Sequence, residues 1–149
     1  MPLHRFFVPT GLYTPEDKAA ISEAITQLYS NPPTSLPQFY VVVLFIELEK
    51  GNFFNGGKAT DGMARITIEH VARNFAADDA ARKRGFMDRY EQVIAPFTKN
   101  RGINWEVTVV DTDPLLWNIN GIAPPQGNTE AEALWRRENK AVPFEKSQL

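Results

Sequence analysis

The order of the apolar segments constrains the fold of this chain more than any other feature. Strand-like apolar runs alternate with amphipathic helical segments, and the order strand, helix, strand occurs twice. This order is typical of a βαβ unit, whose crossover connection is right-handed. The two predicted units span residues 2–48 and 64–111, with strands at 3–8, 38–48, 64–71 and 103–110 and helices at 15–30 and 77–94.

The first unit has the clearest boundaries. Thr14 is a typical N-cap, Pro15 occupies the first helical position, and Asn31-Pro32-Pro33 ends the helix. The segment 38–48 is apolar almost throughout. This composition predicts a strand that is covered on both faces, as in a parallel sheet.

The remaining boundaries come from proline, glycine and a capping pattern. Pro96 does not fit a helix interior, so the second helix is expected to end or kink just before it. Residues 51–57 contain the glycines of a loop. Residues 112–149 are expected to form a turn, a short helix and a tail, and Thr129 and Glu132 have the spacing of a capping box there. We expect one domain over residues 1–149.

Composition narrows the class of protein. The 149 residues are 43% hydrophobic, and a chain of this length buries roughly 68–70% of its unfolded surface. The 16 Lys and Arg against 18 Asp and Glu give a net charge of −2, so nucleic acid and anionic membranes are not expected partners. Without cysteine, and with two histidines, the chain is expected to use no metal and no cofactor.

The predicted compartment is the cytoplasm. The longest apolar run, residues 39–46, is too short to cross a bilayer, and the N-terminal residues lack the apolar region of a secretory signal. An alternative is the peroxisome, because Ser147-Gln148-Leu149 is close to the Ser-Lys-Leu signal, although it lacks the basic middle residue.

Pro2 is the first candidate for catalysis. Methionine before a small residue is normally removed, and the proline would then carry a secondary amine that can titrate. Burial beside a cation lowers the pKa of an amine, and a neutral amine is a general base at neutral pH. The alternative is a proline that stands at this position by chance.

Four further residues are candidates for a binding pocket. Arg73 follows the third strand, where α/β sheets bind ligands, and its guanidinium could hold a carboxylate; the alternative is a surface arginine. His70 is in phase with the core residues of its strand, so a hydrogen-bonded core histidine is the alternative role. Tyr29 could pack in the core or extend its hydroxyl into a pocket. Asn118 could cap a turn or present its amide to a ligand.

Two other groups of side chains have simpler interpretations. His4 shares a face with Phe6 on the first strand and is expected to point into the core. Arg82, Lys83 and Arg84 are interpreted as a solvated helix face.

Motifs along the whole chain resemble the tautomerase superfamily. The helix stretch Thr14-Pro15-x-x-Lys18 and the loop Gly51-Asn52-x-Phe54-x-Gly56-Gly57 are similar to the cis-3-chloroacrylic acid dehalogenase group. The C-terminal part, from Trp117-Asn118-Ile119-Asn120-Gly121 through Pro124-Pro125 to Trp135, is similar to fungal proteins of the oxalocrotonate tautomerase type. The resemblance spans residues 2 to about 140 and rests on the joint order of these motifs.

The resemblance implies a fold, an assembly and an activity. It implies an α+β, two-layer, tautomerase/MIF-like fold, in which two βαβ units form a four-stranded mixed sheet with two helices on one face, and a homotrimer. It implies an enol–keto tautomerase for a small α-keto or unsaturated carboxylic acid. By position, Pro2 would be the general acid/base and Arg73 would bind the substrate carboxylate, with Tyr29, His70 and Asn118 completing the pocket.

Departures from the dehalogenase pattern leave alternatives open. The second arginine of that pattern falls on Ala76, and its water-activating glutamate falls among Trp117 to Asn120, where no carboxylate stands. A hydratase, dehalogenase or decarboxylase would need another activating group, such as Glu106 or His70. A non-catalytic oligomeric binding domain that retains Met1 is a second alternative. A dimeric α+β barrel outside the superfamily is a third.

Overall fold

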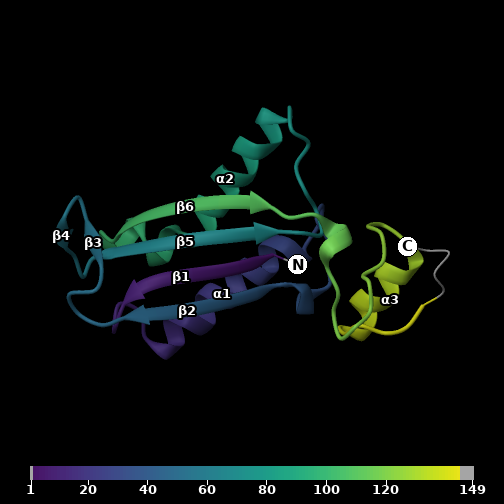
Figure 1. Cartoon of the computed structure of the whole chain (residues 1–149), viewed down its shortest axis with the longest axis horizontal. Helices are drawn as coiled ribbons and strands as arrows, with labels where there is room; N and C mark the ends of the chain where they lie inside the picture. The colour runs from purple at the N-terminus through teal and green to yellow at the C-terminus, as the bar shows by residue number, and fades with distance from the viewer. Residues whose placement is uncertain (1, 145–149) are drawn as a thin grey trace.

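The fold is an α+β arrangement of a four-stranded main sheet, a two-stranded hairpin and three α-helices in the described residues. The computed structural model describes residues 2–144. Its main sheet consists of β1 (Leu3–Pro9), β2 (Val42–Leu48), β5 (Met63–His70) and β6 (Asn104–Asp111). The helices are α1 (Pro15–Ser30), α2 (Ala80–Ile94) and α3 (Glu130–Glu138). Figure 1 shows α1 and α2 behind the sheet, while α3 lies beyond one end of the strands.

The sheet is mixed, as expected for two joined βαβ units. Its strand order is β2-β1-β5-β6. β1 pairs with β2 in parallel, and β5 pairs with β6 in parallel, so each pair belongs to one unit. The two units meet where β1 and β5 run antiparallel. The predicted four-stranded mixed sheet with two helices on one face is therefore confirmed.

Strand alternation places the core between the sheet and the two long helices. Even-numbered residues of β1 and β5 are buried, among them Phe6 and Ile66. Ile25 of α1 and Tyr90 of α2 are fully buried against this face. Because side chains on a strand alternate between faces, His4 and His70 point to the same side. Both are buried, as their phase in the sequence predicts.

The ends of the helices follow their local sequence signals. Thr14 caps α1, and its side chain and that of Asp17 form a capping box. α2 starts later than predicted, at Ala80, because Asp79 accepts a hydrogen bond from the Arg82 backbone and caps the helix there. At Pro96 the chain passes from the α-helix into a 3₁₀ turn, Ala95–Phe97, as expected.

The segment 38–48 differs from its prediction. Residues Gln38–Tyr40 form a 3₁₀ turn, and the strand begins only at Val42. β2 is an edge strand, and helices cover only one face of the sheet, so Leu44 on the other face is 43% exposed. The prediction of a strand covered on both faces is therefore wrong for the single chain. The predicted loop 51–57 also contains part of a two-stranded hairpin, β3 (Phe54–Asn55) and β4 (Lys58–Ala59).

The C-terminal segment is fixed to the domain by an aromatic cluster. Trp135 of α3 is fully buried, and its indole N–H donates to the backbone oxygen of Val142 at 2.7 Å. Its ring lies 5.9 Å from that of Phe39 and 6.1 Å from that of Tyr40. In the described residues, no helix is long and apolar enough to cross a membrane. The sequence Ser147-Gln148-Leu149 lies outside the described residues.

Replacing Trp135 with alanine tests whether this cluster holds the C-terminal segment in place. We expect Trp135→Ala to lower the free energy of unfolding by about 3–5 kcal/mol, because it leaves a large cavity. Urea unfolding measures this difference. Arg137→Ala, an exposed position on the same helix, should change stability by about 0.5 kcal/mol or less. A Trp135→Ala variant as stable as Arg137→Ala would contradict this role.

Candidate functional site

Four of the five predicted site residues surround one small cavity. Pro2 is buried at the start of β1, where its backbone oxygen accepts a hydrogen bond from the Val42 N–H at 3.0 Å. The cavity beside it has a volume of about 10 Å³. Tyr29, His70 and Arg73 line it together with Pro2. The fold thus brings the N-terminal Pro2, the C-terminal end of α1 and the C-terminal end of β5 together around one cavity.

Tyr29 and His70 form a buried hydrogen-bonded pair. The Tyr29 hydroxyl lies 2.7 Å from Nε2 of His70. Asp111, at the end of β6, has its Oδ1 at 3.8 Å from the other ring nitrogen of His70, and its Oδ2 accepts the backbone N–H of Phe75. The carboxylate favours the tautomer whose Nδ1–H faces Asp111, so that Tyr29 donates its hydroxyl proton to His70.

His4 forms a second buried pair next to the first. Its Nδ1 lies 3.1 Å from the Tyr90 hydroxyl, and its ring lies 5.4 Å from that of Tyr29, edge to face. His4 does not line the cavity beside Pro2. Its position supports the predicted packing role, and its contact with Tyr29 fixes the orientation of that ring.

Burial determines the protonation of these groups. Desolvation lowers the pKa of His70 to about 4, although the nearby Asp111 carboxylate acts in the opposite direction. Desolvation lowers the pKa of His4 to about 3, and the charge on His70 adds to this effect. Burial also raises the pKa of Tyr29 well above its ordinary value. At neutral pH both imidazoles are therefore neutral, and the phenol keeps its proton.

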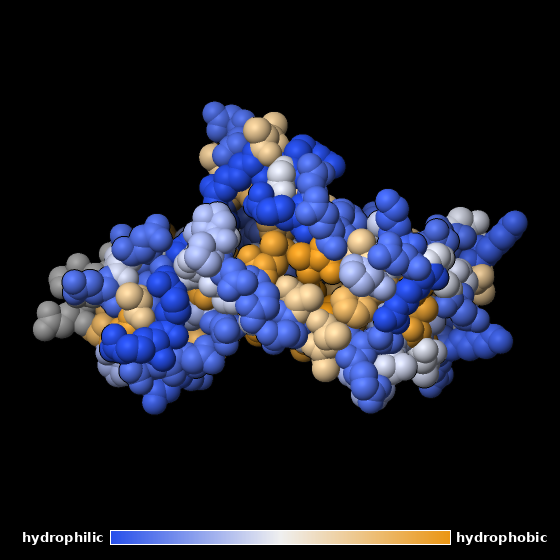
Figure 2. All heavy atoms as spheres, turned by 180° about the vertical axis from the view of Figure 1, so that it is seen from behind, coloured by the Kyte–Doolittle hydropathy of each residue, from blue (hydrophilic) through white to orange (hydrophobic). Residues whose placement is uncertain are grey.

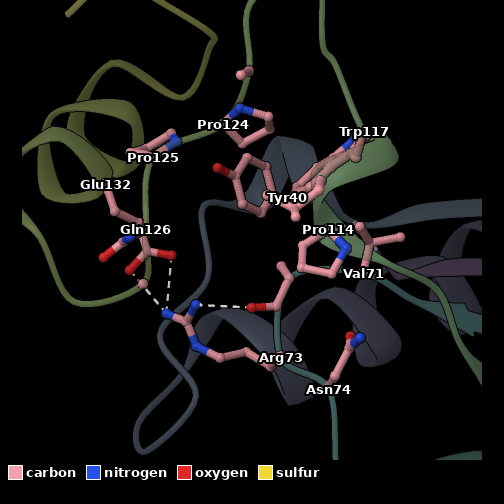
Figure 3. A pocket seen from close by; sticks show the side chains of 14 residues that line it. Tyr40, Val71, Arg73, Asn74, Pro114, Trp117, Pro124, Pro125, Gln126 and Glu132 are labelled. Carbon is pink, nitrogen blue, oxygen red and sulfur yellow. Dashed lines mark hydrogen bonds and ion pairs between the residues drawn. The ribbon is translucent and has the colours of Figure 1, made fainter. Parts of the chain in front are cut away.

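Arg73 is held by a carboxylate of this same chain. Its Nη2 donates to both oxygens of Glu132, at 2.9 and 2.8 Å, and its Nη1 donates to the backbone oxygen of Ala72 at 3.1 Å (Figure 3). The chain passes so close at Gly127 that a Cβ atom there would collide with the guanidinium. Glu132 also accepts the backbone N–H of Asn128 at 2.7 Å. This carboxylate therefore offsets much of the charge of Arg73.

Glu132 is the residue that sequence reasoning missed. The sequence pattern assigns it only to a capping box, and half of that box forms: the Thr129 hydroxyl accepts the backbone N–H of Glu132. The Glu132 side chain is 1% exposed and faces Arg73 instead. Its position in the first turn of an amphipathic helix, close to the buried Trp135, is the signal that could have indicated burial.

Two larger cavities lie on either side of Arg73. The first has a volume of about 450 Å³ and shares Val71, Ala72 and Arg73 with the Pro2 cavity. Glu132 lines it, together with mostly apolar side chains of the C-terminal segment (Figure 3). The second has a volume of about 380 Å³ and shares Tyr29, His70 and Arg73 with the Pro2 cavity. Figure 2, a view from behind, shows apolar side chains gathered in a hollow in the middle of a largely hydrophilic surface.

Two other predicted residues lie away from this site. Asn118 is exposed and lines none of the cavities described above. Glu106 pairs with Arg65 on the sheet face that the helices do not cover, so it does not reach Pro2. Within residues 2–144, no three His, Cys, Asp or Glu side chains are grouped so that they could hold a metal ion.

The sequence matches a family model over residues 1–140. This family, Tautomerase_3, carries the description "Putative oxalocrotonate tautomerase enzyme". Because the match covers almost the entire chain, the protein belongs to this family. The alternative of an α+β barrel outside the superfamily is thereby excluded. Among proteins with curated descriptions, none matches this sequence.

Solved structures agree with this assignment. Native RhCC from Rhodococcus jostii RHA1 is 38% identical with a TM-score of 0.90, over 95% of this chain and 99% of that one. AU4130 from Aspergillus fumigatus, described as a probable enzyme, is 38% identical with a TM-score of 0.88, over 97% of this chain and 98% of that one. N1, of the cis-3-chloroacrylic acid dehalogenase family, is 18% identical with a TM-score of 0.72, over 92% and 97%, and shares the fold.

The two buried histidines predict that acid destabilises the fold. Their folded-state pKa values lie below the ordinary value of 6.5, so the unfolded chain binds more protons as the pH falls below 6.5. The stability contributed by the neutral imidazoles is complete above about pH 6.5 and is lost toward pH 4 and 3. At about pH 5 we expect each histidine to lower the free energy of unfolding by about 2 kcal/mol relative to neutral pH.

Urea unfolding at about pH 7.5 and about pH 5 measures this loss. His4→Gln and His70→Gln should each remove about half of the difference in unfolding free energy between the two pH values. The chain has only two histidines, so the double variant should remove most of it. A wild-type unfolding free energy that is equal at both pH values would show that the histidines are not held neutral.

Proposed function

We propose that this protein is an enol–keto tautomerase that acts on a small α-keto or unsaturated carboxylic acid. The observation that carries this proposal is the shared cavity of Pro2, Tyr29, His70 and Arg73. The family assignment supports it, because the family description names a tautomerase. In this proposal Met1 is removed, so that Pro2 bears a secondary amine.

The amine of Pro2 transfers one proton in two steps. Burial disfavours the charged form of this amine, which favours the neutral base. The neutral amine takes the proton from the enol oxygen, and the electron pair of the O–H bond stays on the oxygen of the resulting enolate. As this pair forms the carbonyl, the electron pair of the C=C bond takes a proton from the ammonium, so that a C–H bond forms and the amine is neutral again. No atom is gained or lost, and no cofactor is needed.

Arg73 and Tyr29 position the substrate in this mechanism. A guanidinium has five N–H bonds, and the contacts of Arg73 with Glu132 and Ala72 use only part of this set. The N–H bonds that remain can bind the substrate carboxylate. Tyr29 is held in place by His70 and lines both the Pro2 cavity and the cavity of about 380 Å³, from which it can contact the substrate enol.

We also propose that the protein assembles as a homotrimer. The sheet face without helices carries exposed apolar residues, such as Leu44, and Val110 at 59% exposure. A second copy of the chain would cover them. Fused 4-OT, which is 21% identical with a TM-score of 0.64, over 89% of this chain and 98% of that one, is described as an asymmetric trimer.

A hydratase or dehalogenase is a second candidate, favoured by one observation. Glu132 is a buried carboxylate next to Arg73, where hydration chemistry would need a base. However, Asn128 and Arg73 already donate to its oxygens. An acceptor in such contacts is a weak base, so we favour the tautomerase.

The ketonisation rate of phenylenolpyruvate tests the proposal. In chains without Met1, verified by intact mass, we expect Pro2→Ala to lower kcat/KM by roughly 10²–10⁴-fold, the range for loss of a general acid/base. Pro143→Ala, at an exposed proline, is the matched control and should have the wild-type rate.

Two outcomes would contradict the proposal. One is equal activity of Pro2→Ala and the wild type. The other is a wild-type rate no higher than that of the buffer, which would shift attention to hydration chemistry or to a binding role with Met1 retained.

A further inference from the structure

Asp111 faces the buried pair of Tyr29 and His70 from the neighbouring strand. In the sheet register, Asp111 of β6 lies opposite His70 of β5, and the Thr112 N–H donates to the backbone oxygen of His70 at 2.7 Å. The Asp111 Oδ1 lies 3.8 Å from Nδ1 of His70. Among residues 2–144, this ring nitrogen has no hydrogen-bond partner, although it is buried. The carboxylate is therefore placed to determine whether this nitrogen bears a proton.

The two nitrogens of the His70 ring have different roles because the ring is neutral. Burial lowers the pKa of His70 to about 4 against the opposing effect of Asp111. Arg82, which lies over the Phe75 ring and lines the cavity of about 380 Å³, adds to the lowering. In a neutral imidazole one nitrogen is a donor and the other an acceptor. A carboxylate near Nδ1 favours the N–H on that side, which leaves Nε2 as the acceptor for the Tyr29 hydroxyl.

The direction of this bond fixes what Tyr29 can do toward the Pro2 cavity. A phenol has one hydrogen, and the contact of 2.7 Å with His70 uses it. Any hydrogen bond between the Tyr29 oxygen and a group in the cavity must therefore be donated by that group. Pro2 and Tyr29 line the same cavity of about 10 Å³, a space for at most about one water molecule. Once Met1 is removed, the neutral Pro2 amine has one N–H that can be this donor.

We propose that Asp111 is a positioning residue, which orients the lone pair of the Pro2 amine through His70 and Tyr29. This inference rests on the proposed function. The Pro2 N–H donates to Tyr29, and Tyr29 donates to His70, whose Nδ1–H faces Asp111. With its N–H held in this way, the amine directs its lone pair away from Tyr29, toward the substrate. The enol proton that the amine takes up then faces the substrate carbon to which it is returned.

A carboxylate maintains this order because it accepts at both oxygens. The Asp111 Oδ2 accepts the Phe75 N–H at 3.0 Å, while Oδ1 faces His70. An asparagine side chain has one oxygen and one NH₂ group. When its oxygen accepts the Phe75 N–H, its NH₂ group faces Nδ1 of His70. Nδ1 then accepts, the ring proton moves to Nε2, and Tyr29 donates its proton toward Pro2, where it occupies the lone pair of the base.

Nitrogen NMR of the histidine ring tests this order directly. The protonated and unprotonated nitrogens of a neutral imidazole have well-separated ¹⁵N shifts, and His4→Gln leaves His70 as the only histidine of the chain. In this background, without Met1 and at neutral pH, we expect the His70 proton on Nδ1. In Asp111→Asn we expect it on Nε2. The matched control is Asp113→Asn, a neighbouring carboxylate that accepts the Leu115 N–H, and it should keep the proton on Nδ1.

Ketonisation kinetics test whether this order serves catalysis. We expect Asp111→Asn to lower kcat roughly tenfold to hundredfold, the scale of one hydrogen bond to a charged group. KM should change by less than about twofold, because the substrate carboxylate still binds Arg73. In a Tyr29→Phe background, which lacks the phenol oxygen, adding Asp111→Asn should lower kcat by less than about twofold. Asp113→Asn should have the wild-type rate.

Three results would overturn the inference: a His70 proton on Nε2 in the wild type, a proton that stays on Nδ1 in Asp111→Asn, or a loss of kcat on Asp111→Asn that is equally large in the Tyr29→Phe background. A merely structural role of Asp111 gives the last result. A wild type without ketonisation activity would refute the proposed function and, with it, the catalytic role of Asp111. The position of the His70 proton is measured without turnover, so the two failures are distinguishable.

Discussion

The contact between Arg73 and Glu132 is the interaction on which the site depends. It joins the loop after β5 to the first turn of α3, two parts of the chain that are 59 residues apart. Glu132 is almost completely buried, so removing Arg73 would leave a charge with weaker compensation in the interior, a costly change. The pair fixes the guanidinium next to Pro2 and holds the C-terminal segment over it. Its carboxylate also offsets the charge of the arginine that we propose binds the substrate.

Because of this ion pair, the two large cavities next to the Pro2 cavity differ in charge. On the side of the C-terminal segment, the cavity is mostly apolar and carries the Glu132 carboxylate. On the side of α2, the cavity is basic and contains the Tyr29–His70 pair. The two cavities therefore differ in the charge of the side chains that line them. Burial completes the arrangement, because it keeps His70 neutral and the Tyr29 hydroxyl protonated.

Much of the fold could be predicted from the sequence because its signals are local. Strand alternation placed His70 toward the core, and Thr14 marked the start of α1. The same alternation could have placed Glu106 on the open face, since it is out of phase with the partly buried Trp105. Glu132 could not be assigned in this way, because its partner is distant in the sequence. The exposure of Leu44 depends on which elements cover β2, and strand composition does not specify them.

The pKa of the Pro2 amine distinguishes a catalytic proline from a structural one. A chain without Met1, labelled with ¹⁵N at proline, allows the amine to be titrated by NMR. We expect a pKa below the ordinary value of an N-terminal proline, measured in the unfolded chain, because the residue is buried. We also expect the rate of ketonisation to rise with the neutral fraction. An amine that titrates at or above the ordinary value, or a rate that does not follow it, would contradict a catalytic Pro2.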